Sequence, residues 1–170
     1  DTVQVLLQND CEVVIPGGQN CCGSLHAHNG LMDTARSLAR RMVETFESYR
    51  LDAIVMNSAG CSAFMKEYGH VLAENEEYAR RAEKIAEKVK DISEFLLSID
   101  FIRPATEIRQ RVVYHEACHL VHSQKVSEQP KQVLRAIPGL EITELNEATW
   151  CCGSAGIYNI IRYEDSMKLL

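Results

Sequence analysis

The sequence predicts an α/β fold made of two similar units, each with a small parallel sheet flanked by helices. Three observations support this prediction. Short apolar runs typical of buried strands alternate with longer segments of helical periodicity. The segment Cys-Cys-Gly-Ser occurs twice, at 21–24 and at 151–154. Cysteines follow the predicted strands in loops at or near their carboxyl ends, the edge of a parallel sheet where ligand sites lie.

The first predicted unit covers residues 1–100 and opens with a strand and a helix. The apolar run 11–15, Cys-Glu-Val-Val-Ile, predicts a buried strand that ends at Pro16-Gly17-Gly18. The first Cys-Cys-Gly segment follows in a loop. From Leu31 to Phe46 apolar residues recur in steps of three or four, which predicts an amphipathic helix.

A second strand and a long helix complete this unit. Residues 52–57, Asp-Ala-Ile-Val-Met-Asn, predict the strand, and the following loop leads into Cys61 and a short helix. The strongest helical periodicity runs from Asn75 to Asp100 and predicts one helix that lies on a sheet or on another domain. A coiled coil is the less favoured interpretation, because the apolar seam covers only about three repeats.

The second predicted unit covers residues 101–170. Residues 111–114, Arg-Val-Val-Tyr, predict a strand that runs into Cys118. A short helix is expected over 130–137 with proline at its start. A further strand is expected over 140–145, followed by the second Cys-Cys-Gly segment and a terminal helix.

Composition limits the classes of function. The 170 residues are 46% apolar and 25% charged, with a net charge of −6 and a pI near 5.5. No basic stripe interleaves with aromatic residues, so nucleic acid is not an expected partner. No apolar run approaches the roughly 20 residues of a membrane span, so any membrane contact would be peripheral. Seven cysteines, an odd number, favour a reducing cytoplasm and metal or redox chemistry over disulfides.

The two Cys-Cys-Gly segments are suited to a soft metal centre. Adjacent cysteines cannot be bridged to each other without strain, so each pair offers two thiolates from one short stretch. The glycine lets the chain turn sharply or approach a ligand closely. Thiolates presented in this way favour an iron–sulfur cluster first and zinc second.

The spacing of the cysteines indicates a repeat. The two segments lie 130 positions apart, with Cys61 downstream of the first and Cys118 upstream of the second. If both units have the order Cys…Cys-Cys-Gly…Cys, the first lacks a leading cysteine near position −12 and the second a trailing one near position 191. We therefore expect a piece of a longer protein, which binds metal weakly or not at all by itself. The alternative is that Cys61 and Cys118 are simply buried small residues.

Four stretches carry a resemblance to a known family: 19–30, 57–61, 114–120 and 150–156. They resemble the cysteine-rich Cys-Cys-Gly domains of the glycolate oxidase (glycolate dehydrogenase) iron–sulfur subunit. The resemblance covers essentially the whole chain and extends to the connecting stretches 65–69 and 135–140. A wider family includes a heterodisulfide reductase subunit, an anaerobic glycerol-3-phosphate dehydrogenase subunit and a lactate-utilisation iron–sulfur protein.

The resemblance implies a role in electron transfer. The whole protein would carry [4Fe–4S] clusters in a ferredoxin-like part, and partner subunits would bind FAD and oxidise glycolate to glyoxylate. Electrons would leave through this subunit toward a membrane quinone or another acceptor. The chain would be an oxidoreductase subunit without catalytic residues of its own, cytoplasmic or peripheral at the inner face of the membrane.

The resemblance also assigns metal ligands. Cys11 lies outside the family pattern and is expected to be structural. Cys61 is followed by Ser62, Ala63 and Phe64, so the Cys-x-x-Cys ending of heterodisulfide reductase units is missing. A five-cysteine cluster is therefore disfavoured, while a simpler cluster, a zinc site in a redox-silent docking module, or a vestigial site remain open. The family cysteines are Cys21, Cys22 and Cys61 in one unit and Cys118, Cys151 and Cys152 in the other.

Two other readings of the histidines and cysteines are weaker. The segment 115–119, His-Glu-Ala-Cys-His, has the spacing of a zinc protease, but it directly follows a strand, where the two histidines would not converge on a metal. A Cys118–histidine nucleophile lacks an identifiable oxyanion hole and leaves both Cys-Cys-Gly segments unexplained. His26 and His28 are expected to hydrogen-bond loop backbone, with tuning of a nearby cluster as the alternative.

Overall fold

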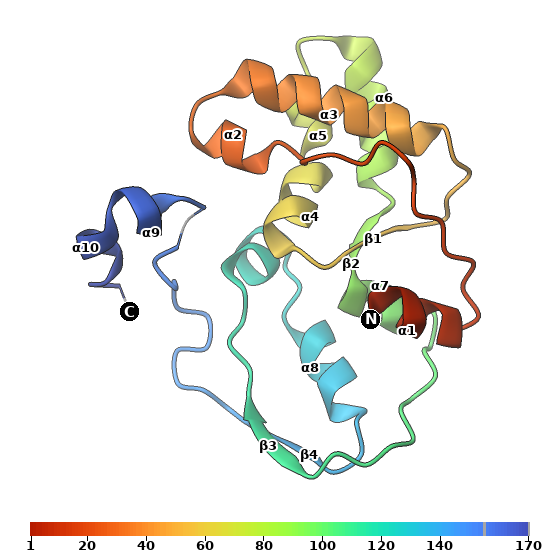
Figure 1. The fold of residues 1–170 in the computed structure, drawn as a ribbon, viewed down its shortest axis with the longest axis vertical. Helices are drawn as coiled ribbons and strands as arrows, with labels where there is room; N and C mark the ends of the chain where they lie inside the picture. Colours follow the sequence, from red (N-terminus) through yellow and green to blue (C-terminus); the bar gives the residue numbers. More distant parts are fainter. Residues whose placement is uncertain (155, 170) are drawn as a thin grey trace.

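The computed structural model describes residues 1–154 and 156–169, and it confirms an α/β fold with small parallel sheets flanked by helices (Figure 1). Strand β1 (Ile54–Met56) pairs in parallel with β2 (Val89–Asp91), and β3 (Gln110–Val113) pairs in parallel with β4 (Leu140–Thr143). Parallel pairing requires a crossover connection, and in both cases that connection contains helices. Ala155 and Leu170, which belong to the predicted second unit, lie outside the described residues.

The crossovers carry the helices that matter for the site. Between β1 and β2 the chain forms α4 (Ala59–Lys66), α5 (Tyr68–Val71) and α6 (Glu76–Ala86). Between β3 and β4 it forms a short π-helical turn, η1 (His119–Ser123), and α8 (Glu128–Arg135).

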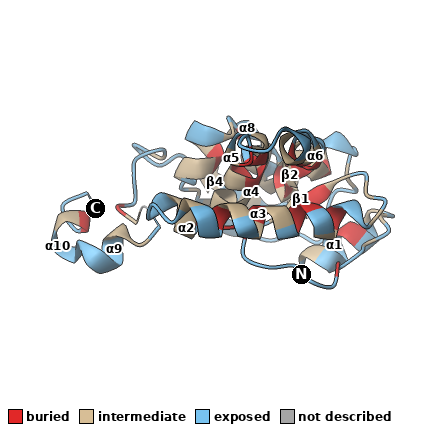
Figure 2. Ribbon diagram, turned by 90° about the horizontal axis from the view of Figure 1, so that it is seen from above, coloured by how far each residue is buried: buried red, intermediate tan, exposed pale blue. Residues whose placement is uncertain are grey.

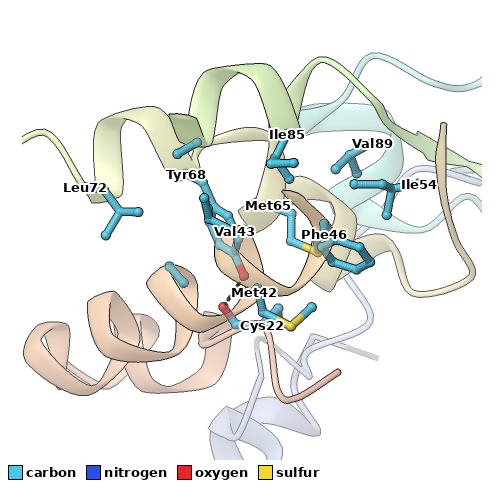
Figure 3. Packing of buried hydrophobic residues seen from close by; sticks show 12 residues of the cluster. Cys22, Met42, Val43, Phe46, Ile54, Met65, Tyr68, Leu72, Ile85 and Val89 are labelled. Atoms are coloured by element: carbon cyan, nitrogen blue, oxygen red, sulfur yellow. Dashed lines mark hydrogen bonds between the residues drawn. The ribbon is translucent and has the colours of Figure 1, made fainter. Parts of the chain in front are cut away.

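The main hydrophobic core lies between α3 (Met32–Glu47), the α4–α6 crossover and the β1–β2 sheet. In the edge-on view of Figure 2, α2 (Ser24–His28) and α3 form the lower layer, and α5, α6 and α8 lie above. Twelve buried side chains make up the core, ten of which are labelled in Figure 3. They are Cys22, Ala39, Met42, Val43, Phe46, Ile54, Met65, Tyr68, Leu72, Ala82, Ile85 and Val89.

Helix α3 confirms the helix predicted from Leu31 to Phe46, with its buried residues on one face. Strand β1 confirms the strand predicted over 52–57, and β3 and β4 confirm the two strands of the second half within one or two residues. Helix α8 begins two residues earlier than predicted, so that Pro130 is its third residue. The predicted terminal helix is two short helices, α9 (Tyr158–Ile161) and α10 (Tyr163–Ser166).

The predicted strand over 11–15 is wrong. Helix α1 (Thr2–Gln8) precedes it, and the N–H of Cys11 donates to the carbonyl of Leu6, which closes that helix. The rest of the run has no partner strand among the described residues, and Ile15 is 73% exposed. An apolar run becomes a strand only where another strand pairs with it, and this condition lies outside the local sequence.

The single helix predicted from Asn75 to Asp100 is also wrong. The segment forms α6, then β2, then α7 (Ile92–Ser98). Asp91 caps α7, with Glu94 completing a reciprocal capping box, so a helix start lies inside the predicted helix. Val89 is buried in the core, and its pairing with Ile54 of β1 places it in a strand.

The C-terminal arm of α9 and α10 extends beyond α2, away from the two layers (Figure 2). None of the helices in the described part of the chain has the length and apolar character needed to cross a membrane.

Candidate metal centre

The first Cys-Cys-Gly loop has a conformation that requires its glycine. Gly23 has a φ of 91° and precedes α2. A Cβ at this position would lie 3.0 Å from the carbonyl oxygen of Ala35 in α3, so the loop packs directly on helix backbone. The N–H of Gly23 donates to the sulfur of Cys21 at 3.5 Å. The turn exposes Cys21 and buries Cys22.

The second loop repeats this geometry. Gly153 has a φ of 70°, and its N–H donates to the sulfur of Cys151 at 3.4 Å. A Cβ on Gly153 would lie 2.7 Å from the carbonyl oxygen of Ser166 in α10, and the Ser166 hydroxyl donates to the Gly153 carbonyl at 2.8 Å. Both thiols of this pair, Cys151 and Cys152, are exposed.

A buried tyrosine holds the first loop in place. The hydroxyl of Tyr68 donates to the carbonyl oxygen of Cys22 at 2.7 Å (Figure 3). The Tyr68 side chain is fully buried, and its ring packs edge-to-face against Phe64 at a centroid distance of 5.7 Å. Tyr68 therefore fixes the backbone from which the buried thiol projects.

Cys61 lies in the first turn of α4 and packs against the core cluster that contains Cys22. Burial raises the pKa of Cys22 to about 12, and a hydrogen bond with Cys61 and the charges of Cys61 and Cys21 act in the same direction. The bond to the Ser24 backbone opposes this shift. Burial, followed by the charges of the same three thiols, also raises the pKa of Tyr68. The charges of the first-half thiols therefore act on the Tyr68 hydroxyl, which donates to the Cys22 carbonyl.

Cys118 and the second loop are joined by histidines. Cys118 immediately precedes η1, a type of turn often found at functional sites. The Nε2 atoms of His115 and His122 lie 3.1 Å and 3.2 Å from the carbonyl oxygens of Trp150 and Thr149. Carbonyls only accept, so both rings donate from Nε2. The residues just before Cys151 are thus attached to the Cys118 segment.

The zinc-protease reading of 115–119 does not fit this structure. His115 lies before the helical turn that contains His119, so the two histidines do not share a helix face. Glu116 is buried, pairs with Lys131 Nζ at 2.7 Å and accepts a hydrogen bond from Ser127 at 2.5 Å. Burial raises the pKa of Glu116, but its bonds to Lys131 and Ser127 outweigh burial, so the net pKa lies below its ordinary value. Glu116 therefore fixes the loop.

The two halves meet on one side of the molecule. Gln124 Nε2 donates to the carbonyl of Ala59 at 3.0 Å and to the hydroxyl of Ser62 at 2.8 Å, which joins η1 to α4. The rings of His28 and His119 lie 5.8 Å apart. A Cβ built on Gly156 would lie 3.1 Å from the Leu25 side chain, so residues that follow the two Cys-Cys-Gly segments lie close together.

The donor set suits a thiophilic group in chemical type. All seven cysteines are free thiols, and Cys61 packs against the core cluster that contains Cys22. Among the described residues, no three Cys, His, Asp or Glu side chains converge closely enough to hold a metal ion. Cys11 donates to the carbonyl of Asn9 at the end of α1, apart from the others. The ligand role of the six cysteines therefore stays a prediction.

Sequence reasoning missed the residues that support the cysteines. Tyr68, Gln124 and Ser166 each donate a hydrogen bond across a long sequence separation or between elements, and no local pattern marks such bonds. The Glu116–Lys131 pair joins residues fifteen positions apart and likewise has no local signature in the sequence.

Comparison with known proteins matches residues 1–66 and 112–169 to the family of cysteine-rich CCG domains. The chain is 42% identical to the probable glycolate oxidase iron-sulfur subunit of Bacillus subtilis, over 99% of this chain and 38% of that protein. It is 32% identical to lactate utilization protein A of Bacillus licheniformis, over 94% of the chain and 66% of the relative. The chain thus spans little more than a third of the first of these relatives. Both Cys-Cys-Gly loops lie within the matched residues, and the chain belongs to the CCG family of cysteine-rich domains.

Proposed function

We propose that this chain is the cysteine-rich part of an iron–sulfur electron-transfer subunit in a flavin-dependent 2-hydroxy-acid oxidoreductase, with glycolate as the substrate and glyoxylate as the product. The observation that carries the proposal is the 42% identity to a probable glycolate oxidase iron-sulfur subunit over nearly the whole chain. Identity to lactate utilization protein A is lower, at 32%, which favours glycolate over lactate.

The proposed ligands form two sets within the units 1–100 and 101–170. Cys21, Cys22 and Cys61 form the first set, and Cys118, Cys151 and Cys152 the second. A bound [4Fe–4S] cluster would accept and release one electron at a time, as a flavin on a partner subunit is reoxidised. The matching turns at Gly23 and Gly153 support two equivalent units.

The chain's own residues would set the properties of such a centre. The N–H groups of Gly23 and Gly153 already donate to cysteine sulfur, and hydrogen bonds to sulfur are one determinant of cluster potential. Cys22 holds its proton strongly because it is buried, so binding at this thiol would release a proton. Tyr68 would keep the Cys22 backbone fixed as the proton leaves.

The expected partners follow from the same role. Subunits that carry FAD would oxidise glycolate, and a membrane quinone or another acceptor would receive the electrons. The protein would work in the cytoplasm or peripherally at the inner face of the membrane. This chain contributes no residue to the hydride chemistry in this proposal.

Spectroscopy of the intact protein, purified and reconstituted without oxygen, tests the proposal. We expect broad visible absorbance that bleaches when glycolate is added together with the FAD-binding subunits, and a paramagnetic signal in the reduced sample. A colourless, redox-silent protein that contains zinc would contradict electron transfer and support a docking module. Bleaching by lactate but not by glycolate would contradict the proposed substrate alone.

A further inference from the structure

Gln124 joins the segment that carries Cys118 to the helix turn that carries Cys61. It follows η1, six residues after Cys118, and its amide nitrogen donates to the Ala59 carbonyl at 3.0 Å and to the Ser62 hydroxyl at 2.8 Å. Ala59 and Ser62 lie on either side of Cys61 in the first turn of α4. One side chain of the second half thus bonds to the backbone and hydroxyl that flank a proposed ligand of the first half.

The bonding partners fix the orientation of this amide. The Ala59 carbonyl can only accept, so the nitrogen of Gln124 must face it. The hydroxyl of Ser62, which is fully buried, donates within its own helix turn to Ser58 at 3.1 Å and is free to accept from Gln124. Both bonds therefore depend on the NH₂ group.

The other end of the amide indicates what Gln124 does. Its Oε1 is buried and has no hydrogen-bond donor among the described residues. A buried acceptor without a donor opposes the stabilisation that the two N–H bonds provide. We therefore expect Gln124 to contribute little to the free energy of unfolding. Its two hydrogen bonds act instead on the position of the first turn of α4.

We infer that Gln124 is a positioning residue that holds the α4 turn carrying Cys61 against the core around Cys22, and so makes the first set of thiols depend on the Cys118 segment of the second half. The functional meaning of this inference rests on the proposed ligand role of Cys61. The geometric part concerns the thiols themselves and can be tested without metal.

The test compares alkylation rates of individual cysteines in the reduced, metal-free intact protein, measured by mass spectrometry. Gln124→Met keeps the length of the side chain and removes the donors. We expect the alkylation rate of Cys61 to rise about fivefold or more, the factor that corresponds to the net contribution of even one of the two lost hydrogen bonds. Cys11, half-buried at the end of α1, is the internal reference and should keep its rate.

Two further variants sharpen the result. Gln124→Glu keeps the shape but places a charged acceptor against the Ala59 carbonyl, which cannot donate, so the rate at Cys61 should rise more than in Gln124→Met. Gln132→Met, at an exposed position on α8, is the matched control and should leave all rates unchanged. The thermal unfolding midpoints of Gln124→Met and of this control should differ little.

An unchanged rate at Cys61 in both Gln124 variants would overturn the inference. So would an equal acceleration at Cys11 and Cys61 with a large drop in the unfolding midpoint, because that pattern describes a general loss of stability. If the wild-type protein takes up neither iron nor zinc while Gln124→Met still accelerates Cys61, the positioning role stands and the proposed function fails.

Discussion

Cys22 differs from the other predicted ligands in its surroundings. It is 4% exposed and lies in the main core, whereas Cys21, Cys151 and Cys152 are exposed. A buried thiol in an apolar setting is a poor nucleophile because it holds its proton. The same Cys-Cys sequence therefore gives two thiols of different reactivity in the first loop and two similar ones in the second.

Alkylation of the reduced, metal-free protein at pH 8 should distinguish these thiols. We expect rapid labelling of Cys21, Cys151 and Cys152 and slow labelling of Cys22, whose pKa is about 12. Peptide mapping over time gives each rate. Equal rates at Cys21 and Cys22 would show that the first loop does not bury its second thiol.

The raised pKa of Cys22 also predicts a dependence of stability on pH. The folded protein keeps the proton above the ordinary pKa of 9.0, where the unfolded chain releases it. The free energy of unfolding should therefore fall as the pH rises from about 9 toward about 12. Urea unfolding of wild type and Cys22→Ala across this range isolates the contribution, because the variant should show a shallower decline. Identical declines would contradict the assignment.

Removal of the Tyr68 hydroxyl tests its bond to Cys22. Tyr68→Phe leaves the Cys22 carbonyl buried without this donor and should lower the free energy of unfolding by about 1–3 kcal/mol. Tyr163→Phe, at a side chain that is 64% exposed, is the control and should change it by less than about 0.5 kcal/mol. Denaturant titration measures the free energy of unfolding of both variants. Equal decreases would contradict a role of the Tyr68 hydroxyl in fixing the Cys22 backbone.

At the scale of elements, the sequence predicts a helix or strand correctly where the segment's own residues specify it, and fails where the element depends on a distant partner. Helix α3 and strand β1 were predicted because periodicity and apolar runs of their own specify them. The segment 11–15 was misassigned because strand formation needs a partner. In the segment 75–100 the capping box at Asp91 was a local signal, but the continuous apolar seam obscured it.

The Cys-Cys-Gly turn is an element that can be tested through its glycines. Gly23→Ala and Gly153→Ala each place a Cβ on a left-handed backbone and within 3.0 Å of a neighbouring carbonyl oxygen. Each should lower the free energy of unfolding by about 1–3 kcal/mol. Gly17→Ala, where a Cβ meets nothing within 4 Å, should change it by less than about 0.5 kcal/mol. Comparable effects at Gly17 and Gly23 would contradict the turn geometry.

At the scale of the whole molecule, contacts between distant segments bring the two predicted units together. The sequence indicated which cysteines to consider, through the repeated Cys-Cys-Gly segment and the family resemblance. It could not indicate that Gln124 reaches Ala59 and Ser62, or that His28 faces His119, because these pairs are more than sixty residues apart. The proximity of the two halves is therefore seen only in the tertiary structure.

The measurement that tests the central claim most directly is the iron and zinc content of the intact protein, purified without oxygen, in wild type, Cys22→Ser, Cys152→Ser and Cys11→Ser. We predict the full iron content in wild type and in Cys11→Ser, and a lower iron content in each of the other two variants, whose remaining iron would belong to the ferredoxin-like part. Iron content that is unaffected by both Cys22→Ser and Cys152→Ser, or zinc in place of iron in wild type, would contradict an iron–sulfur centre held by the paired cysteines.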